Sequence, residues 1–169
     1  MHVRAIAVTL ILTMTVTSSM SAAHAAAASS SQPGAALSGS CTFRNTEIAT
    51  ASSFDQTSSA SFVKLKDAGS ITFMQNATGC VAGTFFANAG NETDGDHVLL
   101  QVLLDGKACP PLSSGYIFAN SGQDFSSHMA AFFCGARIAA GKHSVQVQYA
   151  SGQGGNAELF QRTLEVTHQ

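Results

Sequence analysis

The acidic loop Asn91–Asp96 brings the hard oxygen ligands of Asn91, Asp94 and Asp96 close together, with Glu92 as a further ligand in the same loop. Carboxylate and amide oxygens are the ligands that Ca²⁺ takes in proteins, so this acidic loop is a candidate calcium site. The ligand spacing of an EF-hand is absent, and Asp-Gly-Asp is also common in turns. We therefore expect a solvated loop, with calcium binding at Asn91, Asp94 and Asp96 as the alternative.

A hydrolase would need a different set of residues. A serine hydrolase places a nucleophilic serine beside a histidine base. Ser126-Ser127-His128, with Asp124 nearby, offers such an adjacency, but the sequence has no GxSxG nucleophile motif. A glycosidase needs two carboxylates across a cleft, and the spacing of the acidic residues singles out no pair. The sequence therefore predicts a protein that is not an enzyme, with a small secreted hydrolase as the alternative.

Four cysteines are the remaining residues with distinctive chemistry: Cys41, Cys80, Cys109 and Cys134. An even count in an exported chain favours two disulfides, and four cysteines allow three pairings. Thiolates could also hold zinc, but no CxxC pair has the spacing of a zinc site. We favour Cys109–Cys134 together with Cys41–Cys80, because Cys109 and Cys134 both lie in the aliphatic centre of the chain.

Export itself is inferred from the start of the chain. A short basic start precedes the apolar run Ala5–Val16, which is too short to span a bilayer, and Ala23–Ala25 fits the small-x-small cleavage rule. We expect a signal peptide over residues 1–25. Residues 26–40 form an Ala/Ser-rich stretch that we expect to be a flexible linker. The mature protein is then extracellular or periplasmic, with no membrane insertion after cleavage.

Composition narrows the choice of partner. The 169 residues contain 8 Lys and Arg against 10 Asp and Glu, a net charge of −2, and the charges are scattered. No basic stripe exists, so nucleic acid and anionic membranes are poor partners. With no Trp and two Tyr, the chain lacks the usual aromatic platform for sugars, and we expect most of its 11 Phe in the core. A protein or a glycan ligand stays open.

Residues 41–169 have the pattern of one domain of short strands separated by turn residues. Val98–Leu104 is apolar on both faces, and Asp105-Gly106 predicts a tight hairpin directly after it. His143–Tyr149 shows the most regular alternation of apolar and polar residues. About eight or nine such strands, with no amphipathic helix, predict an antiparallel all-β sandwich or barrel.

Two stretches carry more specific expectations. Cys41–Arg44 is expected to be the first strand, and Asn45–Ala60 is expected to be a loop anchored by Ile48 and Phe54. Within the strand pattern that begins at Cys80, Gly83 weakens the strand unless a neighbouring group packs closely over it or a bulge forms there.

The aliphatic strand also raises the question of oligomerisation. Its two apolar faces, and the doublets Phe85-Phe86 and Phe132-Phe133, leave a second apolar surface that needs cover. A homo-oligomer such as a trimer would cover that surface. A loop or the N-terminal segment folding over it would serve equally well.

The stretch Ala140–Val166, AGKHSVQVQYASGQGGNAELFQRTLEV, resembles the last hairpin of small secreted bacterial jelly-roll-type proteins. Gly79–Gly90, GCVAGTFFANAG, followed by the aliphatic hairpin, resembles the same group. The resemblance implies a jelly-roll β-sandwich and supplies no catalytic residues, so we expect a secreted binding or structural module. A more general similarity to C1q/TNF-like jelly rolls implies a trimeric ligand-binding module as a further alternative.

Overall fold

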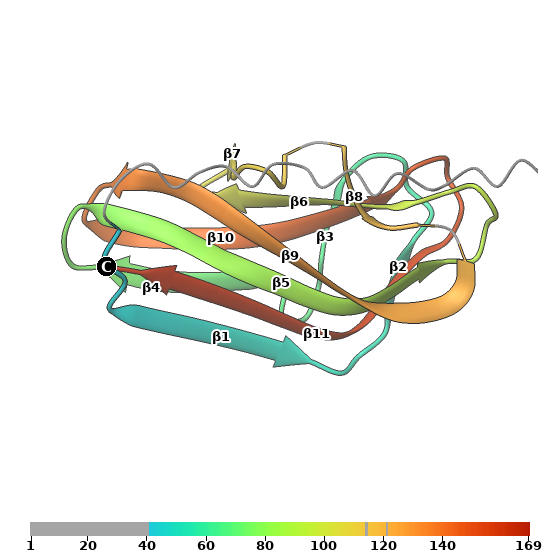
Figure 1. Cartoon of the computed structure of the whole chain (residues 1–169), viewed down its shortest axis with the longest axis horizontal. Coiled ribbons are helices and arrows are strands. Elements are labelled where there is room, and N and C mark those ends of the chain that lie inside the picture. Colours follow the sequence, from blue (N-terminus) through green and yellow to red (C-terminus); the bar gives the residue numbers. More distant parts are fainter. Residues whose placement is uncertain (1–40, 114, 121) are drawn as a thin grey trace, which may run out of the picture. The chain divides into compact units, whose positions relative to one another are not determined.

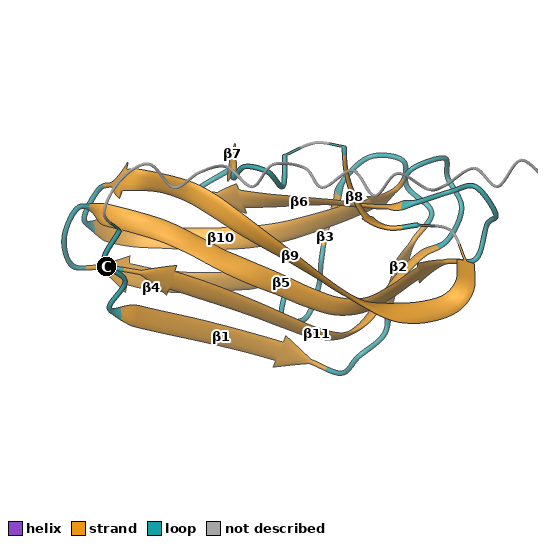
Figure 2. Ribbon diagram, in the orientation of Figure 1, coloured by secondary structure: helices purple, strands orange, loops and turns teal. Residues whose placement is uncertain are grey.

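The computed structural model describes residues 41–113, 115–120 and 122–169, and the regular structure of this part consists of β-strands (Figure 2). The strands are β1 (Asn45–Ala51), β2 (Asp55–Thr57), β3 (Val63–Lys64), β4 (Ser70–Gln75), β5 (Gly79–Asn91), β6 (Val98–Leu104), β7 (Lys107–Ala108), β8 (Tyr116–Ala119), β9 (Gly122–Ile138), β10 (Gly141–Ser151) and β11 (Ala157–His168). The described residues contain no helix long and apolar enough to cross a membrane. The expected signal peptide and linker, residues 1–40, lie outside them and stay predictions.

The strands form two antiparallel sheets that pack face to face (Figure 1). Sheet A has the order β1-β11-β5-β9, and β2 also pairs with β11. Sheet B has the order β3-β10-β6-β7, with β4 on β10 and β8 on β6. The pairings are nested, because β1 pairs with β11, β4 with β10, β5 with β9 and β6 with β8. This is the order that a long hairpin gives when it rolls up, so the expected jelly-roll sandwich is confirmed.

The start of the domain differs from the expectation. Cys41–Arg44 is not a strand; the first strand is Asn45–Ala51, inside the stretch expected to be a loop. Five of its seven side chains are exposed, so its sequence carries no apolar alternation. It becomes a strand because seven consecutive residues pair with β11. The described residues form more than the expected eight or nine strands, because β2, β3 and β7 are only two or three residues long and carry too little pattern to be predicted.

The aliphatic strand and its hairpin form as predicted. In β6, Val98, Leu100 and Val102 are fully buried, whereas Leu99 and Leu103 on the other face are half-buried. The hairpin turns at Asp105 (φ 48°) and Gly106 (φ 81°), the positive angles that a two-residue turn of this kind requires. The strand therefore lies in the interior of sheet B between β10 and the short strands β7 and β8.

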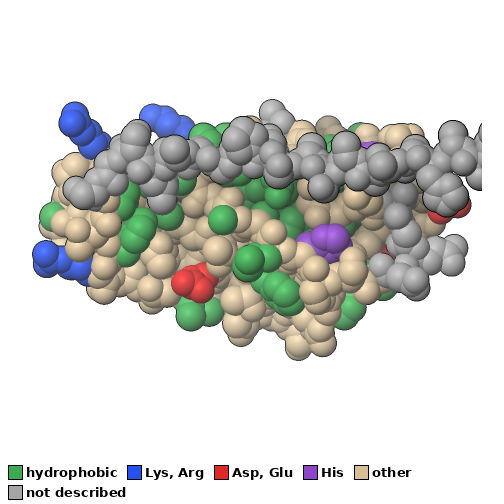
Figure 3. Space-filling model, viewed as in Figure 1, with side chains coloured by type: hydrophobic (Ala, Val, Ile, Leu, Met, Phe, Trp, Pro, Cys, Tyr) green, Lys and Arg blue, Asp and Glu red, His purple; other side chains and the backbone are tan. Residues whose placement is uncertain are grey.

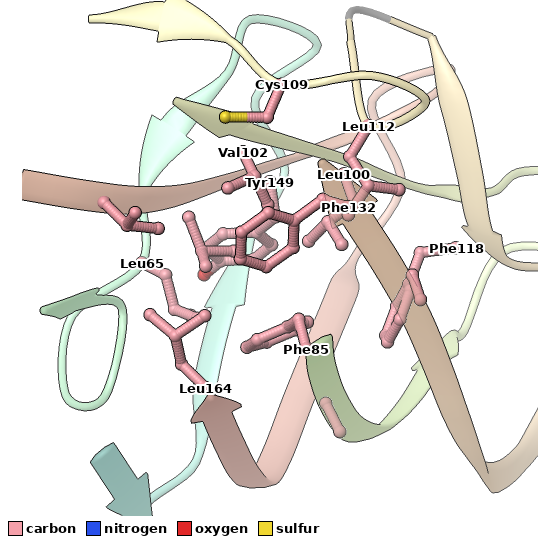
Figure 4. Packing of buried hydrophobic residues seen from close by; sticks show 14 of the residues in the cluster. Leu65, Phe85, Leu100, Val102, Cys109, Leu112, Phe118, Phe132, Tyr149 and Leu164 are labelled. Carbon is pink, nitrogen blue, oxygen red and sulfur yellow. The ribbon is translucent and has the colours of Figure 1, made fainter. Parts of the chain in front are cut away.

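The core lies between the two sheets. Figure 4 shows Phe85 and Leu164 from sheet A meeting Leu100, Val102 and Tyr149 from sheet B. All five side chains are at most 1% exposed. This packing fixes the backbone of sheet A, and with it the positions of the side chains on its opposite, solvent side.

Two disulfides connect the four cysteines. They join Cys41 to Cys80 and Cys109 to Cys134, the pairing favoured from the sequence. The first ties the segment before β1 to β5. The second ties the loop after β7 to β9, and so links sheet B to the edge of sheet A. Two disulfides are typical of proteins outside the reducing cytosol.

Gly83 in β5 is explained by a close contact. It pairs with Phe132 of β9, and a Cβ added at Gly83 would lie 2.6 Å from the Phe132 ring. The ring is 3% exposed and occupies the space that a larger side chain would need. The expectation that a neighbouring group packs closely over this glycine is therefore confirmed.

Candidate functional site

Asp96, one of the calcium candidates, joins two loops at one end of the sandwich. Its carboxylate is completely buried and accepts hydrogen bonds from the backbone N–H of Gln153 (2.7 Å) and of Gly155 (2.8 Å). The N–H of His97 (2.6 Å) and the Ser151 hydroxyl donate two more. Burial raises the pKa of Asp96, but these hydrogen bonds outweigh it and lower the pKa to about 2.

The other two calcium candidates, Asn91 and Asp94, differ in their burial. Asn91 is buried; its Oδ1 accepts from the N–H of Thr93 (3.0 Å) and its Nδ2 donates to the His97 carbonyl (3.4 Å). Asp94 is exposed. Within the described residues, no group of three His, Cys, Asp or Glu side chains could hold a metal ion. The geometry gives Asp96 a loop-holding role, and calcium binding at Asn91, Asp94 and Asp96 stays a prediction.

His128, the base of the hydrolase alternative, does contact a serine. Its Nε2 lies 2.7 Å from Ser126 Oγ, and its ring lies 5.6 Å from that of Phe118. Burial lowers the pKa of His128 and favours the neutral imidazole. No described carboxylate hydrogen-bonds this histidine, and the side chain of Asp124 lies outside the described part. The pair thus has a nucleophile and a base but no orienting acid within that part.

The acidic residues that could serve a glycosidase are either buried or bound to other side chains of the fold. Burial and the nearby charge of Glu92 raise the pKa of Glu158, as a general acid would require. Glu158 is only 5% exposed, however, so a substrate has almost no access to it. Asp105 is bound at 2.6 Å by His143 Nδ1, whose Nε2 lies 2.9 Å from the Ala139 carbonyl. The contacts of Glu158 and Asp105 therefore give both carboxylates a role within the fold.

The solvent side of sheet A, which we call the outer face, carries a hollow of about 360 Å³. On this face Ala82 pairs with Phe133, and Thr84 pairs with Ala131 and with Glu165. The hollow is lined by Ala82, Gly83, Thr84, Pro110, Pro111, Ala131, Phe132, Phe133, Glu165 and Thr167. Most of these are apolar, so we call it the apolar hollow. Figure 3 shows this face, with separate hydrophobic side chains among the uncharged surface and the visible lysine and arginine side chains toward the left end.

The wall of the apolar hollow comes from sheet B. The Phe133 N–H donates to the Pro110 carbonyl at 2.8 Å, and the Cys109–Cys134 disulfide holds the same loop to β9. In addition, the Cys109 N–H donates to the Val102 carbonyl at 2.8 Å. Pro110 and Pro111 therefore stand as a fixed ridge along the β9 edge.

A second hollow, of about 560 Å³, lies further along the same face and is lined by Thr50, Ala51, Ser52, Phe86, Gln161, Arg162 and Thr163. We call it the polar hollow, because hydroxyl and amide groups border it. A bulge in β11 creates it: the register with β5 shifts between Phe160 and Thr163, and Gln161 has a φ of 49°. Arg162 is 1% exposed, and its guanidinium donates to the Leu159 carbonyl (3.2 Å) and to Ser53 Oγ (2.7 Å).

A polar row and an aromatic pair continue the outer face beyond the polar hollow. Ser127 Oγ donates to Asn88 Oδ1 at 2.6 Å, and Asn88 Nδ2 donates to the Gln161 side chain. Phe125 and Phe160 meet edge to face with ring centroids 5.0 Å apart. Met129, Ala131 and Phe133 are spaced two residues apart in the sequence, which puts them on one side of their strand. This spacing could not show which strands join them, because those partners are far away in the sequence.

Comparison with known proteins gives two distant structural matches. No protein-family model matches the chain. No curated protein matches it. Among solved structures, the CBM36-1 domain of a multidomain xylanase from the hindgut metagenome of Trinervitermes trinervoides is 10% identical, with 71% of this chain and 96% of that chain covered and a TM-score of 0.36. A family two carbohydrate esterase from Cellvibrio japonicus is 15% identical, with a TM-score of 0.30; the match covers 74% of this chain and 34% of that one.

Proposed function

We propose that this protein is a secreted, non-enzymatic binding module whose ligand lies on the outer face of sheet A. One observation carries the proposal: an apolar hollow opens on the solvent side of a rigid sheet, between Phe133 and the Pro110-Pro111 ridge. Concave apolar surfaces with a few polar groups at their border are typical of ligand sites. An apolar surface of this kind on a soluble protein commonly marks an interaction site.

The side chains around the hollow support binding over catalysis. Glu165 is the single carboxylate among its lining residues, whereas glycoside hydrolysis uses two. The Ser126–His128 pair is not among the lining residues and has no acid partner in the described part of the chain. A secreted hydrolase built on His128 therefore stays the alternative.

The proposal is tested by mapping which face binds small molecules. A mixture of neutral fragments is titrated into the ¹⁵N-labelled protein, and amide shifts are followed. We expect the shifts to cluster at Ala82, Ala131 and Phe133, and to disappear in Phe133→Ser.

The matched control is Ile117→Ser, which removes an apolar side chain that is 48% exposed on sheet B. This variant should bind like the wild type. Shifts that cluster on sheet B, or that survive in Phe133→Ser, would contradict the proposed site. Turnover of chromogenic esters that is lost in His128→Gln would support the hydrolase instead.

A further inference from the structure

We propose that the ligand of the outer face is an uncharged polysaccharide chain that lies across the apolar hollow and the polar hollow together. This inference rests on the proposed function and adds the chemical class and the direction of the ligand. Its three supports are the continuity of the two hollows, the chemistry of their walls and the charge of the described residues that line them.

The two hollows are neighbours on the same two strands. On β5, Thr84 lines the first and Phe86 lines the second; on β11, Glu165 lines the first and Thr163 the second. Each pair is two residues apart and shares the outer face, a step of about 7 Å along a strand. From Ala82 to the row of Asn88 the face extends about 20 Å. A ligand that uses both hollows must therefore be elongated.

The walls alternate in a way that suits sugar rings. A pyranose has apolar C–H faces and a rim of hydroxyl groups, so it needs a flat apolar contact beside uncharged donors and acceptors. Phe133 and the two prolines supply the apolar contact in the first hollow. Hydroxyl and amide groups supply the hydrogen bonds: Thr84 and Thr167 in the first hollow, and Thr50, Ser52, Gln161 and Thr163 in the second.

The charges of the residues that line the two hollows favour an uncharged polysaccharide. Glu165 and Arg162 are the charged residues that line the two hollows. Arg162 is 1% exposed and its guanidinium is held by Ser53 and the Leu159 carbonyl, so it offers no cation to a ligand. A phosphate, sulfate or carboxylate on the ligand would find no counter-charge there and would be repelled by Glu165. Anionic glycans and nucleic acids fit this surface poorly.

The same walls disfavour an extended peptide. Peptides that add to sheets bind through free backbone groups at a sheet edge. The hollows lie on a sheet face, and beside them the Phe133 N–H at the β9 edge is already bonded to Pro110. A second copy of the chain is the other occupant to test, since Met129 and Ile48 on this face are 71% and 62% exposed.

Native gel electrophoresis in gels that contain polysaccharide tests the inference with the full mature chain. The neutral probes cover α- and β-linked backbones: dextran, starch, mixed-linkage β-glucan, arabinoxylan, glucomannan and galactomannan. The anionic probes are polygalacturonate and heparin. We expect retardation by at least one neutral probe and by neither anionic probe, with longer oligosaccharides of the retarding type binding more tightly than short ones.

Variants assign the binding to the two hollows. Ala131→Gln, at an exposed position that lines the apolar hollow, should weaken binding about tenfold or more because its larger polar side chain fills the hollow, and Phe133→Ser should do so through lost apolar contact. Thr163→Val keeps the shape of the side chain and should weaken binding about fivefold through a lost hydrogen bond. Its matched control, Thr72→Val on the exposed side of sheet B, should bind like the wild type.

The outcomes separate the class of ligand from the location of the site. Retardation by an anionic probe that depends on Phe133 would overturn the uncharged polysaccharide and leave the outer-face site standing. Retardation that none of the face variants changes would overturn the site as well. If no neutral probe retards the protein, the inference is wrong. A mass that falls from dimer to monomer in Ala131→Gln would assign the face to a second copy.

Discussion

Replacing Asp96 with Asn tests whether one carboxylate holds the two loops at the end of the sandwich. Four donors converge on its two oxygens, three of them backbone N–H groups and one the Ser151 hydroxyl. Asparagine keeps the size of the side chain but has one oxygen, and its NH₂ group would face donors. At least one N–H of the Gln153–Gly155 segment would then lose its partner.

The magnitude follows from the pKa of this carboxyl and from the hydrogen bonds. A pKa lowered from 3.8 to about 2 corresponds to about 2 kcal/mol of stability at neutral pH. An unpaired buried donor costs about 1–3 kcal/mol. We expect Asp96→Asn to lose about 2 kcal/mol, which lowers Tm by roughly 5–10 °C in a domain of this size.

Thermal unfolding followed by circular dichroism at several pH values measures the effect. Because the folded pKa lies below the unfolded one, the carboxylate stabilises the fold above pH 4, and its contribution is lost as the pH falls toward 2. The difference in Tm between wild type and Asp96→Asn should therefore be constant from pH 5 to 8 and shrink below pH 4. Asp94→Asn, at an exposed position in the same loop, is the control. A Tm within 2 °C of wild type at pH 7 would refute the loop-holding role.

Three further predictions concern the rest of the sandwich. The hydrogen bond between His143 and the Asp105 carboxylate raises the pKa of His143. His143→Gln should therefore lower Tm at pH 6 and much less at pH 9, and equal losses at the two pH values would contradict the ion pair. Gly83→Ala should cost about 3 kcal/mol or more in urea unfolding, because the added Cβ would lie 2.1 Å from the backbone oxygen of Glu165 and 2.6 Å from the Phe132 ring; a loss below about 1 kcal/mol would contradict this close packing. Replacing Cys109 and Cys134 with Ser should lower the free energy of unfolding by about 3 kcal/mol. The same variant should bind a ligand of the apolar hollow more weakly, as measured by calorimetry. Unchanged ligand binding would mean that the proline ridge keeps its position without the disulfide.

The parts of the fold that could be predicted are those in which one short stretch carries the whole pattern. β6 and its hairpin are an example, since apolar residues and the Asp105-Gly106 turn follow each other directly. β1 is the opposite case. Its strand conformation depends on β11, more than 100 residues later, and its exposed side chains leave no trace in the local pattern.

The candidate site likewise has parts that a short stretch of sequence predicts and parts that depend on distant residues. The acidic loop is visible in the sequence, but the hydrogen bonds from Gln153 and Gly155 to Asp96 join positions 57 and 59 residues apart. The apolar hollow combines β5, β9, β11 and the loop after β7. In the sequence the doublet Phe132-Phe133 is the signal for the apolar hollow, and Phe85-Phe86 is the signal for the polar hollow, because one member of each doublet faces the core and the other lies on the outer face.

The nested pairing of the strands has a consequence for how the chain acquires its structure. β11, the last strand, lies inside sheet A and is flanked by β1 and β5. Until residues 157–168 are present, β1 has no partner in sheet A and β5 lacks one of its two neighbours. Contacts between such distant residues form late and slowly. Sheet A therefore cannot close until β11 has been synthesised, more than 100 residues after β1.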